Sequence, residues 1–215
     1  MSRLQAAGLR QGLGELRLGL NDAQQAQILA YLGLLLKWNT VYNLTALREP
    51  DQVLTHHVLD CLAVIGPMTA RMPALKSVLD VGSGGGLPAV VIALSCPDIQ
   101  VTAVDTVAKK AAFIQTAAHS LGLPNLHGMH ARVEDLRDPF ELVTSRAFAS
   151  LADFTAWSRP ALASNGVWMA MKGRIPEDEI ALLPASVLLE DVQVLQVPGL
   201  DAQRCMVWMR PAMQP

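Results

Sequence analysis

A glycine-rich segment, Asp80-Val-Gly-Ser-Gly-Gly-Gly-Leu-Pro88, has the residue types and spacing that point most directly to chemistry. Gly82, Gly84 and Gly86 let a ligand approach the backbone closely, because a Cβ at these positions would obstruct contact. Pro88 suits the first turn of a following helix, where its missing N–H costs nothing. We expect a cofactor-binding turn that begins at Asp80, although a purely structural turn is the alternative interpretation.

An acidic residue, Asp105, follows Asp80 by twenty-five positions (105 − 80 = 25) at the end of the next predicted strand. There it can accept hydrogen bonds from ribose hydroxyls, or it can cap the next helix. The run from Gly84 to Ala89 also fits the dinucleotide pattern G-x-G-x-x-G/A. The local pattern therefore predicts an adenosine-containing cofactor without separating NAD from S-adenosylmethionine.

Further candidates follow the third, fourth and fifth predicted strands. Val133 and Glu134 lie where such a domain contacts an adenine ring, although they could also begin a simple turn. Arg146 and Lys172 end two strands, and the carboxyl ends of parallel strands meet at one sheet edge, where ligands bind. Two cations at this edge are well placed to meet a phosphate or a purine. Other basic residues that could extend this patch are Lys109, Lys110, Arg132 and Arg174.

Metal and hydrolytic chemistry are not indicated. The histidine pairs, His56-His57 and His127 with His130, lack carboxylate or cysteine companions at ligand spacing, so we predict no metal site. Three scattered cysteines give neither a disulfide framework nor a zinc motif. Gly82-Ser83-Gly84 lacks the G-x-S-x-G spacing of a nucleophile elbow.

The elements that position these residues can be predicted from hydrophobic periodicity. Residues 22–38 and 51–65 show helical spacing, and we expect the first 75 residues to be helical. Short apolar runs then alternate with helical segments. The predicted strands are residues 77–81, 100–105, 126–131, 141–146 and 166–171; the predicted helices start at Pro88 and span residues 107–121 and 151–162. Residues 187–197 and 204–210 should form a closing hairpin at one sheet edge.

This pattern predicts an α/β fold with a Rossmann-like, doubly wound, mostly parallel sheet, a C-terminal antiparallel hairpin and N-terminal helices. We expect residues 1–75 to form a helical extension packed on a core domain of residues 76–215. The chain has 215 residues, 51% hydrophobic and 17% charged, without an apolar run of about 20 residues or a secretory signal. We therefore expect a soluble, cytoplasmic protein with no membrane contact. A formal charge of −2 means that RNA binding would need a local basic patch.

Several motifs, taken in order, closely resemble the RsmG/GidB family of ribosomal RNA methyltransferases over roughly residues 22–210. They are Lys37-Trp-Asn39, Tyr42-Asn-Leu-Thr45, His57-Val-Leu-Asp60, the turn from Asp80 to Pro88, Arg132-Val-Glu134, Ser145-Arg-Ala-Phe-Ala-Ser150 and Met171-Lys-Gly173. The resemblance implies a class I methyltransferase that uses S-adenosylmethionine. It also implies methyl transfer to N7 of a guanine in the 530 loop of bacterial 16S ribosomal RNA, in the small subunit or an assembly intermediate.

Carried over by motif, the resemblance places Gly82 and Leu87 in the cofactor turn, Val133 and Glu134 beside the adenosine, and Arg146 near cofactor and substrate. Two residues depart from the family pattern: His56 stands where Arg is common, and Ala89 where Gly is usual. The first departure removes an expected RNA contact, whereas Ala is well tolerated at a helix start.

Guanine N7 carries a free lone pair and no proton, so its methylation needs alignment more than a general base. We accordingly expect Arg146 and Lys172 to orient the purine. The alternatives are methylation of another RNA or a small molecule, a nicotinamide-dependent oxidoreductase, and a non-catalytic RNA-binding or assembly factor. Only about forty residues follow Lys172, too few for the substrate domain of an oxidoreductase. No dimerisation motif is evident, so we expect a monomer.

Overall fold

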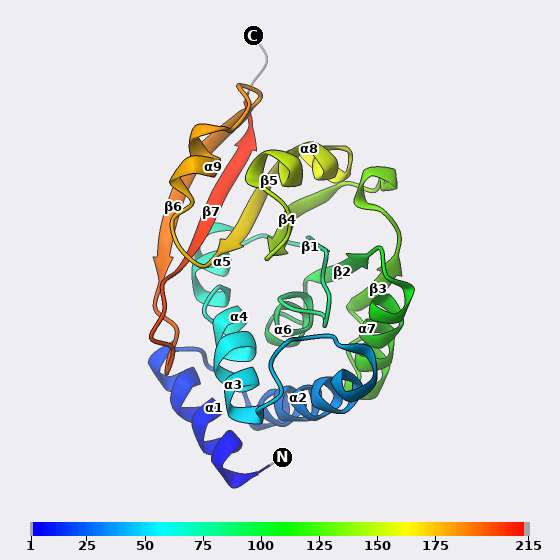
Figure 1. Cartoon of the computed structure of the whole chain (residues 1–215), viewed down its shortest axis with the longest axis vertical. Helices are drawn as coiled ribbons and strands as arrows, with labels where there is room; N and C mark the ends of the chain where they lie inside the picture. The colour runs from blue at the N-terminus through cyan, green and yellow to red at the C-terminus, as the bar shows by residue number, and fades with distance from the viewer. Residues whose placement is uncertain (1, 213–215) are drawn as a thin grey trace.

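The short apolar runs of the sequence become strands of one sheet in the computed structural model, which describes residues 2–212. The strands are β1 (Ser77–Val81), β2 (Gln100–Asp105), β3 (Leu126–His130), β4 (Phe140–Arg146), β5 (Leu162–Lys172), β6 (Val187–Leu195) and β7 (Arg204–Pro211). The strand order is β3-β2-β1-β4-β5-β7-β6 (Figure 1).

The first five strands, β1 through β5, pair with their neighbours in parallel. In contrast, β7 pairs antiparallel with both β5 and β6. The predicted closing hairpin is thus confirmed, with β6 at the outer edge. The chain order reverses between β1 and β4, and this is the switch point at which open sheets bind ligands. The carboxyl ends of β1, β2, β4 and β5 therefore bring the predicted site residues to one edge.

Residues alternate between the two faces of the central strands, so Val78 and Leu79 belong to different hydrophobic cores. The first core lies under α6 (Ala89–Ser95), α7 (Ala108–Leu121) and the N-terminal helices. The second core includes residues of α8 (Leu151–Ser158) and is also contacted by α9 (Glu177–Ala181). Both faces of the sheet are covered, as a parallel sheet requires.

The N-terminal helices are α1 (Arg3–Glu15), α2 (Asp22–Tyr42), α3 (Pro50–Val53), a π-helical turn (Leu54–Leu59), α4 (Asp60–Leu62) and α5 (Ile65–Arg71). Capping boxes at Ser2 and Asn21 start α1 and α2 by satisfying free backbone N–H groups. Because α1 and α2 bury their apolar residues in the first core, this region is continuous with the sheet rather than separately packed.

The stretch Pro50–Arg71 is long and apolar enough to cross a bilayer by length and composition alone, although we expected no such segment from the sequence. Most of its apolar window is buried within the fold, as in the core helix of a globular protein. Several boundaries also differ from expectation: α2 runs on to Tyr42, α8 ends at Ser158 rather than at residue 162, β5 begins at Leu162, four residues before Gly166, and β6 ends at Leu195. The short helix α9 was not predicted, because none of its residues is buried to give a periodic signal.

Candidate active site

The glycine turn after β1 has the geometry that its sequence predicts. Gly82, Gly84 and Gly86 have φ angles of +68°, +57° and +85°, a region that glycine occupies without strain. A Cβ on Gly82 would stand 2.5 Å from Cδ2 of Phe148, so this close approach also requires glycine. The buried hydroxyl of Tyr31, on α2, donates a 2.5 Å hydrogen bond to the Gly85 carbonyl. An N-terminal helix therefore holds the turn in place.

Asp105 joins the turn to the next crossover. Its Oδ2 accepts the Gly84 N–H at 3.0 Å, and its Oδ1 accepts the Val107 N–H at 2.8 Å, next to the start of α7. Lys110 lies 4.0 Å from Oδ2. Asp105 thus fixes the turn and the entry to α7 without capping the helix, and each carboxylate oxygen keeps a further lone pair for a ligand.

A cavity of about 410 Å³, here called the cofactor cleft, opens beside the turn. Four predicted cofactor residues, Gly82, Asp105, Val133 and Glu134, line it together. The remaining lining residues are Val81, Val104, Thr106, Val107, Lys110, Ala131, Arg132, Ala147, Phe148 and Trp157. Its volume lies within the roughly 300–1,000 Å³ of small-molecule sites, and its apolar walls with few polar groups suit a purine nucleoside.

Asp80 lies beneath the turn and is fully buried. Its Oδ2 accepts the Ala89 N–H at 3.3 Å, while its Oδ1 has no partner within the described residues. Burial raises the pKa of this carboxyl to about 7. The cradle that a Cβ would fill and the Asp105 side chain fit a ligand that carries an adenosine, whereas the predicted cofactor residue Asp80 lines none of the cavities described here.

Leu87 and Gly85 line a smaller cavity of about 190 Å³ with Leu35, Leu44, Thr45, His57 and Arg146. The predicted residues Gly84 and Gly86 shape the turn and line none of the cavities described here. Leu87 therefore lines this smaller cavity and not the cofactor cleft.

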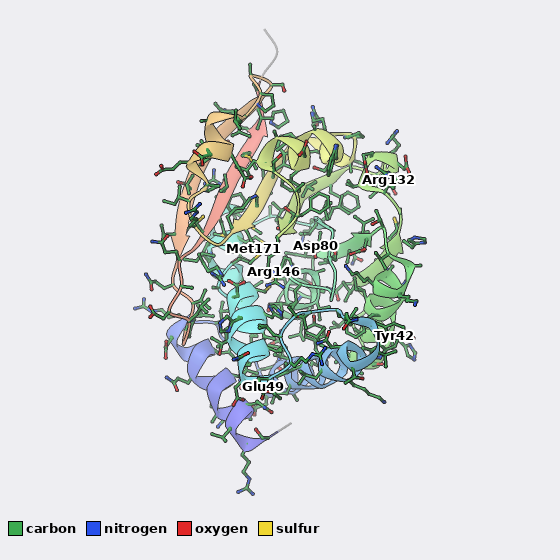
Figure 2. All side chains as sticks on the ribbon, viewed as in Figure 1. Tyr42, Glu49, Asp80, Arg132, Arg146 and Met171 are labelled. Carbon is green, nitrogen blue, oxygen red and sulfur yellow. The ribbon has the colours of Figure 1, made fainter. Side chains whose placement is uncertain are left out.

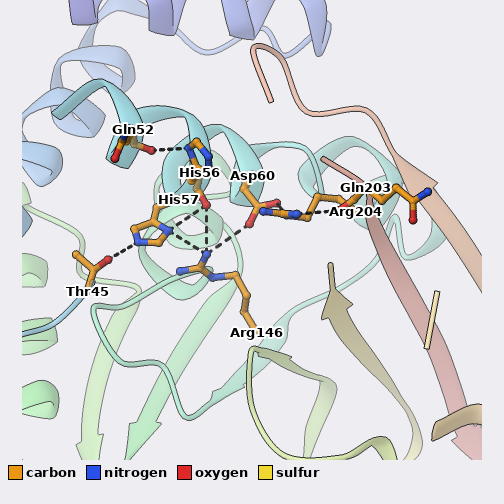
Figure 3. Close-up of polar contacts among 8 residues, drawn as sticks. All are labelled: Thr45, Gln52, His56, His57, Asp60, Arg146, Gln203 and Arg204. Carbon is orange, nitrogen blue, oxygen red and sulfur yellow. Dashed lines mark hydrogen bonds and ion pairs between the residues drawn. The ribbon is translucent and has the colours of Figure 1, made fainter. Parts of the chain in front are cut away.

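Arg146, at the end of β4, is held in a buried polar cluster (Figure 3). One terminal guanidinium nitrogen lies 3.4 Å from Oδ2 of Asp60 and 3.2 Å from Nδ1 of His57. On the other side, Nε of Arg204 donates to Oδ1 of Asp60 at 3.0 Å. Arg146 is therefore not a free surface cation, and its charge is compensated by Asp60.

His57 is neutral in this cluster. Burial and the neighbouring Arg146 cation lower its pKa from 6.5 to about 4. Nδ1 lies 3.0 Å from the His56 carbonyl oxygen and 3.2 Å from a terminal nitrogen of Arg146, and Nε2 lies 2.5 Å from Oγ1 of Thr45. The ring thereby links the segment after α2 to the end of β4.

A second cavity of about 270 Å³, here called the base cavity, adjoins this cluster. It is lined by Asp60, Arg146, Ala147, Met171, Lys172, Gly173, Leu195, Arg204 and Cys205. Ala147 is shared with the cofactor cleft, so the two cavities are neighbours. Figure 2 shows Asp80, Arg146 and Met171 in the central part of the molecule, where these strand ends meet.

Lys172 and Arg146 thus line one cavity, as their positions at neighbouring strand ends predicted. The Nζ of Lys172 is paired with Glu179 of α9 at 2.8 Å. Of the basic residues considered for an extended patch, Lys110 and Arg132 reach the cofactor cleft. Within residues 2–212, no group of three or more His, Cys, Asp or Glu side chains is arranged to hold a metal ion.

Sequence reasoning missed Asp60, Arg204 and Tyr31 as site residues. Asp60 stood in a family motif, but nothing in its spacing showed which strand end it would face. Arg204 is about 140 residues from its partner Asp60, so only tertiary packing brings the two together. The aromatic pair Phe148 and Trp157 gave no local signal either, because their rings meet only in the folded chain.

The fold matches those of S-adenosylmethionine-dependent methyltransferases of known structure. One from Aquifex aeolicus superposes with a TM-score of 0.53 at 14% identity, covering 74% of this chain and 92% of the other. The N-methyltransferase NodS from Bradyrhizobium japonicum gives 0.53 at 12% identity, covering 70% and 93%. These likenesses show that the chain has the fold of class I methyltransferases.

The model of the GidB family, rRNA small subunit methyltransferase G, matches residues 24–207. A relative with the name ribosomal RNA small subunit methyltransferase G, from Acidovorax sp. (strain JS42), is 59% identical over 213 residues, 94% of each chain. Another with that name, from Leptothrix cholodnii, is 57% identical over 194 residues, 89% of each. The chain therefore belongs to the rRNA small subunit methyltransferase G family.

Proposed function

We propose that this chain transfers a methyl group from S-adenosylmethionine to N7 of a guanine in 16S ribosomal RNA, the guanine of the 530 loop. The observation that carries the proposal is the base cavity, which adjoins the cofactor cleft and is lined by the cations Arg146, Lys172 and Arg204. Its substrate would be the small ribosomal subunit or an assembly intermediate, met by a monomer in the cytoplasm.

The cofactor would occupy the cleft beside the glycine turn. Asp105 would accept hydrogen bonds from the ribose hydroxyls, and Val133 and Glu134 would contact the adenine. Asp80, beneath the turn, and the turn glycines would support the amino-acid end of the cofactor. When bound, S-adenosylmethionine supplies an electrophilic methyl group on a sulfonium.

The chain's own contribution is alignment. Guanine N7 has no proton to lose, so the base cavity needs only to hold the purine with N7 toward the cofactor cleft. Arg146 is braced by Asp60 and His57, and Lys172 by Glu179, so both cations are preorganised. The methylated purine becomes cationic, so the arginines serve to position the base rather than to stabilise the product by charge.

Tritiated methyl transfer to small subunits from cells that lack this enzyme tests the proposal. We expect 7-methylguanosine in the 16S RNA; a different methylated nucleoside, or binding of the subunit without transfer, would contradict it. An Arg146→Ala variant that still binds S-adenosylmethionine should lose most transfer, because Asp60 loses one of its two arginine partners and the base loses its support. Arg10→Ala, an exposed arginine on α1, serves as the matched control.

A further inference from the structure

Asp60 is a buried carboxylate in the wall of the base cavity. Its side chain is only 4% exposed, yet it lines the cavity together with Arg146 and Arg204. Each oxygen accepts a bond from one arginine: Oδ1 from Nε of Arg204 and Oδ2 from a terminal nitrogen of Arg146. A purely structural ion pair does not require a cavity beside it. Asp60 is therefore also placed to contact a molecule that enters the base cavity.

An ionised carboxylate offers about four lone-pair positions. The two arginines use one on each oxygen, so Asp60 can accept two more hydrogen bonds. Burial raises the pKa of this carboxyl, and the two arginines partly oppose that rise. Asp60 is therefore a fixed pair of acceptors at the edge of a small cavity.

Guanine is the nucleobase that matches such a pair. Its N1–H and N2 amino group are adjacent donors on the Watson–Crick edge, and carboxylates bind two parallel donors in a bidentate way. Adenine presents an acceptor at N1, and uracil presents a single N–H between two carbonyls. N7 lies on the opposite edge of guanine, so a carboxylate that holds the Watson–Crick edge leaves N7 free to react.

We infer that Asp60 selects the target guanine by accepting hydrogen bonds from its N1–H and N2 amino group in the base cavity. This inference rests on the proposed methylation of guanine N7. At about 270 Å³ the base cavity suits a single base rather than a larger ligand. Met171, Leu195 and Cys205 supply apolar wall for the ring.

The base must leave its stack to enter this cavity, and unpaired nucleotides in RNA loops do so at low cost. Its Watson–Crick edge is then free to meet Asp60. The inference thus also predicts that a guanine held in a Watson–Crick pair is a poor substrate.

The test compares guanosine with inosine, which lacks the N2 amino group, at the methylated position of 16S RNA assembled by ligation. For the wild-type protein we expect kcat/KM to be roughly 10- to 100-fold lower with inosine, since a hydrogen bond to a charged group is lost. In Asp60→Asn this preference should fall at least about tenfold, because the amide presents a donor where an acceptor is needed. Asp98→Asn, an exposed residue before β2, should keep the wild-type preference.

Asp60→Glu should retain a preference for guanosine at reduced kcat, because it keeps the carboxylate. S-adenosylmethionine binding shows that each variant is folded. The inference is overturned if the wild type methylates both bases equally well, or if Asp60→Asn keeps the full guanosine preference. If the wild type forms no 7-methylguanosine at all, the proposed function itself fails, which is a separate and recognisable result.

Discussion

Replacing Gly82 by alanine tests whether the glycine turn is shaped for close approach or only for its backbone conformation. Gly82 has φ +68° and lines the cofactor cleft. The chain offers a matched control in Gly122, the C-cap of α7, which has φ +64° and open space where a Cβ would stand. Both substitutions carry the same conformational cost, but only one meets a neighbour.

The expected magnitudes follow from the structure. A left-handed conformation costs an alanine about 1–2 kcal/mol, so Gly122→Ala should lose that much free energy of unfolding. In Gly82→Ala the new Cβ stands 2.5 Å from the Phe148 ring, about 1 Å inside normal contact. Phe148 must then leave its edge-on contacts with Phe154 and Trp157, each worth about 0.5–1.5 kcal/mol. The total loss should be about 2–5 kcal/mol.

Urea denaturation measures the loss of stability, and titration calorimetry measures the affinity for S-adenosylmethionine. Gly82→Ala should bind at least about tenfold more weakly, equivalent to 1.4 kcal/mol, because its methyl group intrudes on the cleft. Gly122→Ala should bind like the wild type. Equal affinities for the two variants would refute the reasoning, since the turn would then tolerate a side chain facing the cofactor.

Three further predictions concern the groups around the turn. Tyr31→Phe leaves the Gly85 carbonyl without its 2.5 Å donor and should cost about 1–3 kcal/mol of unfolding free energy, measured by urea denaturation; an unchanged midpoint would show that the bond contributes nothing. Asp105→Asn should weaken S-adenosylmethionine binding at least about tenfold in calorimetry, because an amide N–H₂ would face a backbone or ribose donor. The pKa of His57 is lowered to about 4 in the folded protein, so between pH 6.5 and 4 the unfolded state binds the extra proton and stability falls as pH falls. The difference in unfolding free energy between wild type and His57→Gln should therefore shrink across that window, and a pH-independent difference would count against a neutral, buried His57.

Local patterns were enough to predict most of the fold. Five parallel strands and the closing hairpin lie where short apolar runs predicted them, because a buried strand needs a continuous apolar segment and a turn at each end. The boundaries of β5 and α2 were less well defined. The last residues of α2 and the polar residues Ser164 and Asn165 of β5 are exposed, so the hydrophobic pattern is lost there although the element continues.

The candidate site was only half predictable. Gly82 and Asp105 follow strands β1 and β2, and parallel pairing brings such positions to one edge without knowledge of the side chains. Arg146 and Lys172 followed from the same rule. The partners of these two cations could not be predicted. Asp60 and Glu179 lie on helices, and no local residue spacing shows how those helices pack against the sheet.

The sequence by itself determined the doubly wound sheet, the glycine turn and the acidic residue after β2, since each depends on neighbouring residues and on a chain-order rule. Only the tertiary structure decided what those features face. It set Tyr31 of α2 beneath the turn, Phe148 against Gly82, and Asp60 between Arg146 and Arg204. These contacts join segments up to 144 residues apart, and the Asp60 pairing exists because a carboxylate buried where the N-terminal helices pack on the sheet needs a charged partner.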